Sequence, residues 1–231
     1  MAEPDAPKSL ADPAALAERR ALVDAAHLRP IRALARRIAQ ERGAPVPDPD
    51  PLDGGVNARL LLLLETPGPA IVRTGLVSQD NATGTAANLF RFLREAGIAR
   101  ADLLIWNAVP WVIHAQGALN RAPRRSEARA AAPYLAPLLG LLPNLACIVL
   151  AGRFAGEARA PLETLRPDLP VIAVPHPSPT YVCTSPSVRE RILAGLRQAA
   201  DILAHGPGAS NSPPAHDRDT SAAPHRGRAG G

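Results

Sequence analysis

Three polar residues stand where short apolar runs of the sequence end, and their types could do chemistry together. They are Glu65, Asn107 and His176. A carboxylate can orient water, a carboxamide can read the edge of a planar ring, and an imidazole can donate a hydrogen bond to developing negative charge. Each also has a plainer reading, as a helix cap, a turn former or a structural histidine. Their equivalent positions predict one shared site.

The loop around His176 is unusually stiff. Pro175, Pro177 and Pro179 surround the imidazole, with Ser178 between the last two. Proline fixes φ, so such a loop holds its histidine in place and loses little entropy on binding a ligand. The alternative is a rigid turn with a purely structural role.

The elements that must position these residues form a repeated pattern. Four short apolar runs alternate with stretches long enough for crossover helices, which is typical of a parallel sheet covered on both faces. We therefore expect a three-layer α/β/α sandwich with a central four-stranded parallel sheet. Ligands bind outside the carboxyl ends of such strands, where side chains from different loops converge. The runs span residues 59–65, 102–107, 145–152 and 170–176.

The two ends of the chain differ from this core. Apolar residues recur at helical spacing over residues 13–42, which predicts two helices or one helix broken at Pro30. From residue 205 on, almost no large apolar side chain is present, which favours disorder. The expected organisation is a flexible N-terminus (1–12), one domain (13–204, with its core at 59–204) and a disordered tail (205–231).

Composition excludes several classes of protein. The longest strongly apolar run, residues 60–64, is far shorter than the roughly 18 residues that cross a bilayer, and no basic segment followed by an apolar one opens the chain. We expect a cytoplasmic protein without a membrane partner.

Cys147 and Cys183 lack CxxC spacing and are too few for a metal or iron-sulfur cluster, so free thiols are expected. The net charge of +5 suits a polyanionic partner.

Several familiar catalytic motifs are missing from the sequence. It has no GxGxxG dinucleotide turn, no GxxxxGK[ST] phosphate loop and no GxSxG nucleophile elbow. The histidines are too scattered for a metal site. A site without metal or cofactor, built from one acid, one amide and one imidazole, remains.

Three segments carry a resemblance to the uracil-DNA glycosylase superfamily. ETPGP at 65–69 resembles the first motif of the family, WNAVPW at 106–111 its central Asn segment, and HPSPT at 176–180 its final His-Pro-Ser motif. Their order and spacing agree over residues 59–203. The resemblance implies a monomeric hydrolase of base excision repair that removes uracil or another deaminated base from DNA, with no metal and no cofactor.

The resemblance also assigns roles to the three polar residues. His176 would donate a hydrogen bond to the pyrimidine oxygen as the base leaves. Asn107 would read the uracil edge with its donor and acceptor, and would be mispaired by the amine of cytosine. Glu65 would orient or activate water and offset positive charge on the sugar. A flipped base would thus meet all three groups.

Further residues of the two outer motifs are expected to contact substrate. Ser178 and the amide beside it would bind phosphate, and the prolines would press against the DNA. The expected substrate-binding residues of these motifs are Thr66, Pro67, Gly68, Pro177, Ser178 and Pro179.

Some positions depart from the family pattern. Leu76 stands where family members commonly carry an aromatic that stacks on the base, and Leu64 replaces the glycine that usually precedes the acid. Asp80 and Asn81 could hold the catalytic water or cap the following helix. Two alternatives to a glycosylase therefore stay open: an inactive module that binds uracil or nucleic acid, and a hydrolase of free nucleosides or nucleotides.

Overall fold

A computed structural model of the protein describes residues 4–69, 71–115 and 121–206. Its centre is a four-stranded parallel sheet in the order β4-β2-β5-β6. The strands fall on the four predicted apolar runs, so the predicted sheet is confirmed. They are β2 (Leu60–Leu64), β4 (Leu103–Asn107), β5 (Cys147–Ala151) and β6 (Val171–Val174).

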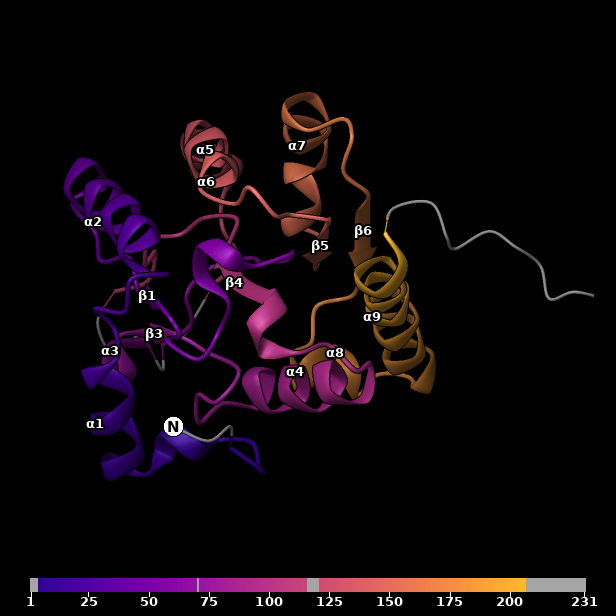
Figure 1. The fold of residues 1–231 in the computed structure, drawn as a ribbon, viewed down its shortest axis with the longest axis horizontal. Coiled ribbons are helices and arrows are strands. Elements are labelled where there is room, and N and C mark those ends of the chain that lie inside the picture. Colours follow the sequence, from indigo (N-terminus) through magenta and orange to yellow (C-terminus); the bar gives the residue numbers. More distant parts are fainter. Residues whose placement is uncertain (1–3, 70, 116–120, 207–231) are drawn as a thin grey trace, which may run out of the picture.

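Helices cover both faces of this sheet, as Figure 1 shows in a view that looks along the layers. One layer contains α2 (Arg29–Arg42), α5 (Arg125–Ala131), α6 (Leu135–Gly140) and α7 (Arg159–Leu165), and the other contains α4 (Gly84–Glu95), α8 (Pro179–Val182) and α9 (Pro186–His205). The three-layer α/β/α sandwich is therefore present. Short 3-10 helices join these elements at Ser9–Ala11, Gly55–Asn57, Arg100–Asp102, Ala132–Tyr134 and Ala155–Ala158.

The strands are apolar at nearly every position because each face of the sheet meets a helical layer. In β2, Leu61 and Leu63 pack in the core with α2 and α6, whereas Leu60 and Leu62 pack in the core with α4 and α9. All four are 0% exposed. A parallel sheet buried on both faces thus explains an unbroken leucine run.

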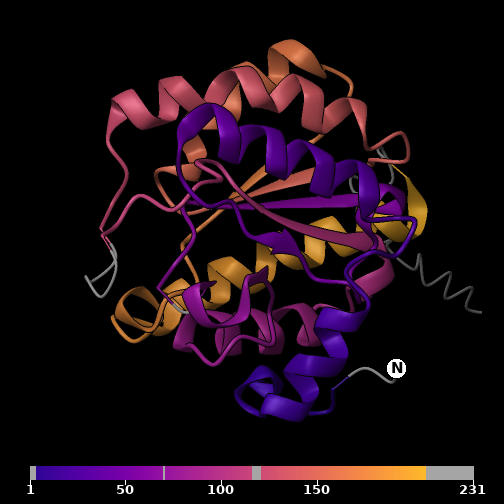
Figure 2. The same cartoon turned by 90° about the vertical axis from the view of Figure 1, so that its left-hand side faces the viewer.

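A smaller unit stands beside the β4 edge of the sheet (Figures 1 and 2). It contains α1 (Pro13–Ala21), α3 (Ile71–Thr74) and a two-stranded parallel pair, β1 (Asp48–Pro49) with β3 (Leu76–Val77). Residues 13–42 form two helices, and Pro30 occupies the first turn of α2, where its missing N–H costs nothing. Gly43, at φ 60°, ends α2 in the left-handed conformation.

The N-terminal segment is more ordered than its composition suggests. Leu10 is 0% exposed and packs with Leu16 and Leu76, and its N–H donates to the Asp80 carbonyl oxygen at 3.1 Å. Asp12 caps α1 by accepting from the Ala14 N–H. One buried leucine thus ties part of the segment over 1–12, which was expected to be flexible, to the domain.

The C-terminal helix continues further than expected. α9 ends at His205, the first residue of the expected tail, while residues 207–231 lie outside the described residues. Both cysteines are free thiols, Cys147 buried and Cys183 exposed. In the described part of the chain, no helix has the length and apolarity needed to cross a membrane.

Candidate active site

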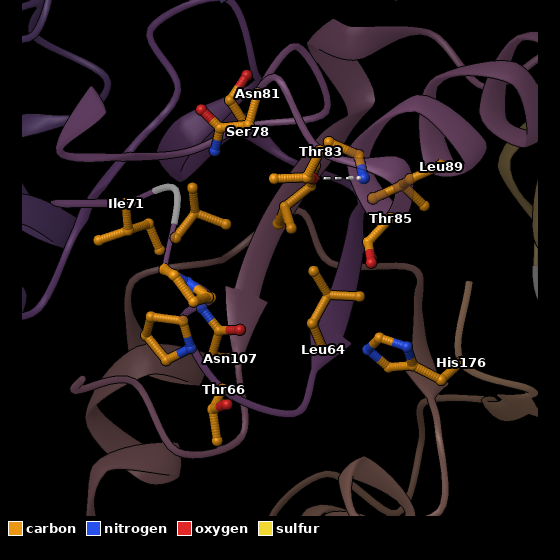
Figure 3. Close-up of a pocket in the computed structure, with 16 residues that line it drawn as sticks. Leu64, Thr66, Ile71, Ser78, Asn81, Thr83, Thr85, Leu89, Asn107 and His176 are labelled. Atoms are coloured by element: carbon orange, nitrogen blue, oxygen red, sulfur yellow. Dashed lines mark hydrogen bonds between the residues drawn. The ribbon is translucent and has the colours of Figure 1, made fainter. Parts of the chain in front are cut away.

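The candidate site lies at the carboxyl end of the central strand β2. After β2 the chain adds β4 on one side and then crosses to add β5 on the other, so the loops that leave β2 and β5 diverge there. Such a switch point is where ligands enter open α/β sheets. A cavity of about 260 Å³ opens at this point (Figure 3). Its lining residues are Leu64, Thr66, Pro67, Gly68, Pro69, Ile71, Val77, Ser78, Asn81, Thr83, Thr85, Ala86, Leu89, Ile105, Asn107 and His176.

Asn107 and His176 face this cavity from opposite sides of Leu64 (Figure 3). Asn107 is the last residue of β4, lies opposite Leu64 in the sheet and is 3% exposed. Within the described residues its carboxamide makes no hydrogen bond to the protein. Its donor and acceptor are therefore free to pair with a ligand.

The sheet pairing continues past Asn107 and fixes its position. The Ala108 N–H donates to the Leu64 carbonyl oxygen at 2.8 Å, and the Val109 N–H donates to the Glu65 carbonyl oxygen at 3.0 Å. These two bonds hold the ends of β2 and β4 together. The positions of Asn107 and Glu65 are thus fixed by backbone hydrogen bonds.

His176 follows β6 and is held as one tautomer. Its Nδ1 accepts the Ser178 N–H at 3.2 Å, so the proton of the neutral ring is on Nε2. Burial lowers the pKa of His176 below its usual 6.5, and the nearby Glu65 carboxylate opposes that shift only in part. The imidazole is therefore neutral at pH 7 and donates from Nε2.

Glu65 lies beside His176 and does not line the cavity itself. Its Oε1 accepts the Phe154 N–H at 3.0 Å, just beyond the end of β5. Gly152, at φ +106°, lies against both partners: a Cβ there would be 2.6 Å from Glu65 Oε1 and 3.1 Å from the His176 Cβ. The ends of β2, β5 and β6 thus meet around one carboxylate and one imidazole.

The remaining predicted substrate contacts divide into two groups. Thr66, Pro67 and Gly68 line the cavity. The loop residues Pro177, Ser178 and Pro179 are not in its lining; they hold His176 and lead into α8, which starts at Pro179.

Leu76 does not contact the cavity, contrary to expectation. Its side chain is 1% exposed and packs with Leu10 and Leu16 on the outer side of β3, while the next residue, Val77, lines the cavity. Successive side chains of a strand point to opposite faces, so a shift of one position exchanges the two roles. Val77, and not Leu76, therefore presents its side chain to the cavity.

Asp80 is also placed away from the cavity, and it does not cap α4. Arg19 donates to it at 2.9 Å and Arg100 at 2.6 Å, both fully inside the protein. The cap of α4 is Thr83, which accepts from the Ala86 N–H. Asn81, in contrast, lines the cavity.

Asp80 belongs to a buried ion network that supports the cavity wall. Besides Arg19 and Arg100, it contains Asp50 and Asp53. Burial raises the pKa of Asp53 to about 8, although the neighbouring Arg100 guanidinium acts in the opposite direction. Through Asp80, this network fixes the segment that carries Ser78, Asn81 and Thr83.

Sequence reasoning missed several cavity residues. Val77, Ser78, Thr83, Thr85 and Leu89 all line it. Thr83 stands before a run with helical spacing, which is a recognisable capping signal. The others lie in β3, directly after it or in α4, and only their spatial position distinguishes them.

The fold and the site define an α/β protein with a cavity of about 260 Å³ at the switch point of its sheet. A family profile, described as the Uracil DNA glycosylase superfamily, matches residues 51–197, more than half of the chain. The chain belongs to this superfamily. Membership indicates a uracil-DNA glycosylase-like function, with hydrolysis as the reaction class and DNA as the partner.

Comparisons with individual proteins add little to this. The solution NMR structure of a proposed uracil DNA glycosylase from Methanosarcina acetivorans is similar at 16% sequence identity and a TM-score of 0.44, covering 64% of this chain and 94% of that one. No curated protein matches the sequence.

Proposed function

We propose that the protein is a monofunctional DNA glycosylase that removes uracil or another deaminated base from DNA without a metal or cofactor. Water adds to C1′ of the sugar while the bond from C1′ to the base nitrogen breaks, and the electron pair of that bond leaves with the base. The base departs as an anion and takes up the proton that the added water releases. The observation that carries the proposal is that Asn107 and His176 face one cavity of about 260 Å³.

The size of the cavity supports a single base as the occupant. Pockets for drug-sized ligands are about 300–1,000 Å³, so one of about 260 Å³ suits one ring system without its sugar and phosphate. The apolar walls supplied by Val77, Leu89 and Ile105 suit the faces of a ring. A base must therefore leave the DNA stack to enter.

The three polar groups then act on different parts of the substrate. Neutral His176 donates from Nε2 to the oxygen on which negative charge develops, which lowers the barrier most when charge is greatest. Asn107 pairs with the edge of the base and favours a base that carries a keto oxygen over one that carries an exocyclic amine. Glu65, fixed by the Phe154 N–H, leaves its second oxygen to orient water and offset the charge of the sugar.

A surface groove next to His176 supports a polymer over a free nucleoside. The groove has a volume of about 670 Å³, and its described lining includes Arg153 and Arg191 and no carboxylate. Tyr181, 57% exposed, lies on the same groove with its ring centroid 6.4 Å from that of His176. Guanidiniums beside an exposed ring suit a phosphate backbone with an unstacked base.

The direct test is an excision assay with labelled oligonucleotides. Single and double strands that carry uracil, hypoxanthine or xanthine are incubated with the protein, and abasic sites are quantified, with cytosine and thymine strands as controls. We expect product from at least one deaminated base. Binding without product would establish the inactive module, and product from free nucleosides alone would establish the other alternative; either result overturns the proposal.

Two variants make the assay specific to this site. Glu65→Gln keeps an acceptor for the Phe154 N–H but removes the charge, so excision should fall about 10²- to 10⁴-fold while the fold persists. Glu163→Gln, which removes a carboxylate from an exposed ion pair with Arg159 on α7, is the matched control. Equal activity of the two variants would remove Glu65 from the mechanism.

A further inference from the structure

A chain of two hydrogen bonds connects helix α4 to the His176 imidazole through one peptide group. Asn88 Nδ2 donates to the Pro177 carbonyl oxygen at 2.9 Å. The N–H of the same peptide group, that of Ser178, donates to His176 Nδ1 at 3.2 Å. The orientation of this peptide therefore decides whether the ring nitrogen meets a donor.

Helix α4 contacts this loop with one face and lines the cavity with the next. Gly84 and Asn88 are four residues apart and so share one face of the helix. A Cβ at Gly84 would be 2.3 Å from Pro179 Cγ, so the first turn of the helix touches the loop as closely as a glycine allows. Thr85 and Leu89, one position further round, line the cavity.

The prolines of the loop leave this peptide group unfixed. Proline fixes its own φ and keeps the residue before it out of the α region, but the plane between residues 177 and 178 can still turn about ψ of Pro177 and φ of Ser178. A rotation there would aim the carbonyl oxygen at Nδ1 and favour the opposite tautomer. The bond from Asn88 prevents it and, by polarising the peptide, strengthens the N–H donated to the ring.

We propose that Asn88 is a positioning residue: by holding the Pro177 carbonyl it keeps His176 as the Nε2–H tautomer aimed into the cavity. The expected effect of Asn88 on the excision rate rests on the proposed function, whereas its effect on the tautomer of His176 does not. The lowered pKa of His176 agrees with a ring that is neutral at pH 7.

The test measures the tautomer and the excision rate separately. Asn88→Leu removes the donor at similar size, Asn88→Asp keeps the shape and places an acceptor against the carbonyl, and Asn144→Asp in the exposed loop before β5 is the matched control. Imidazole ¹⁵N NMR reports the tautomer, with His176 assigned among the six histidines as the signal lost in His176→Gln. Single-turnover excision and DNA affinity are measured on the same samples.

We expect the Nε2–H signature in the full-length protein and in Asn144→Asp, and a mixed or Nδ1–H signature in both Asn88 variants. The single-turnover rate should fall about 10- to 100-fold, the cost of a misplaced catalytic group, with DNA affinity unchanged. An unchanged His176 signature in folded Asn88→Leu or Asn88→Asp overturns the proposal. Loss of DNA affinity in parallel with rate, with the signature retained, shows a merely structural role and also overturns it. A protein that excises no base refutes the proposed function and leaves the tautomer experiment valid.

Discussion

Glu65 Oε1 lies against Gly152 so closely that a Cβ on that glycine would be only 2.6 Å away. The same position is 3.1 Å from the His176 Cβ, and the backbone of Gly152 has φ +106°. One glycine therefore sets the separation of the acid and the imidazole. Any side chain there must move one of them or strain the backbone.

Gly152→Ala should lower both stability and activity. We expect a loss of about 1–3 kcal/mol in the free energy of unfolding from backbone strain, measured by urea denaturation. The excision rate should fall by more than the loss of stability explains, because the new side chain displaces Glu65 and His176. Gly140→Ala, at the end of α6, where nothing lies within 4 Å of the new Cβ, is the control and should be close to unchanged. Full activity of Gly152→Ala would show that the spacing is not critical.

The pH dependence of stability should carry a signature of His176. Its pKa in the folded state lies below the usual 6.5, so the unfolded chain binds the proton more readily. The contribution of His176 to the free energy of unfolding is fully present above about pH 6.5 and is lost as the pH falls through the pKa of the folded state. Denaturation of the protein and of His176→Gln at pH 5 to 8 measures the difference; identical profiles would contradict the burial of the ring.

Excision should follow the same ionisation. The rate should be level from pH 8 to 6.5 and decline only at lower pH, when a proton on Nδ1 displaces the Ser178 N–H and releases the loop. Single-turnover rates across this range test it. A decline that begins above pH 7 would indicate a group other than His176.

Arg19 should be essential for the fold although it lies outside the residues that match the family. It pairs with Asp50 and Asp80 in the interior, so Arg19→Leu removes one of the two guanidiniums that these buried side chains contact and leaves Arg100 to serve both. We expect a loss of about 3–5 kcal/mol in the free energy of unfolding, with part of it restored by Asp80→Asn in the same chain. Arg36→Leu, at an exposed position of α2, should change stability by less than about 0.5 kcal/mol. Similar losses from both variants would refute the special role of Arg19.

The two residues of β3 should separate stability from substrate recognition. Leu76→Ala removes a buried side chain from the contact with Leu10 and should cost about 2–5 kcal/mol, with little change in the excision rate of folded protein. Val77→Ala enlarges the cavity and should raise KM for the base it accepts. Unfolding and excision measured on both variants would reveal an exchange of these roles, which would mean that β3 presents its other face to the cavity.

The sequence by itself determined the layers of this protein and the ends of its strands. Runs such as Leu60–Leu64 are short and apolar at every position, which is typical of a strand buried on both faces, and four of them alternate with helical stretches, so the sheet could be predicted from local pattern. Since parallel strands end at one edge, the approach of Asn107 and His176 to one cavity followed from the same pattern.

Tertiary structure alone decided the contacts that complete the site. Asp80 meets an arginine 61 residues away, and Asn88 meets a carbonyl 89 residues away. β3 is only two residues long, so no alternation shows which of Leu76 and Val77 faces the cavity. Local spacing records which face of an element is apolar, but these partners are brought together by packing of distant segments, which no local pattern encodes.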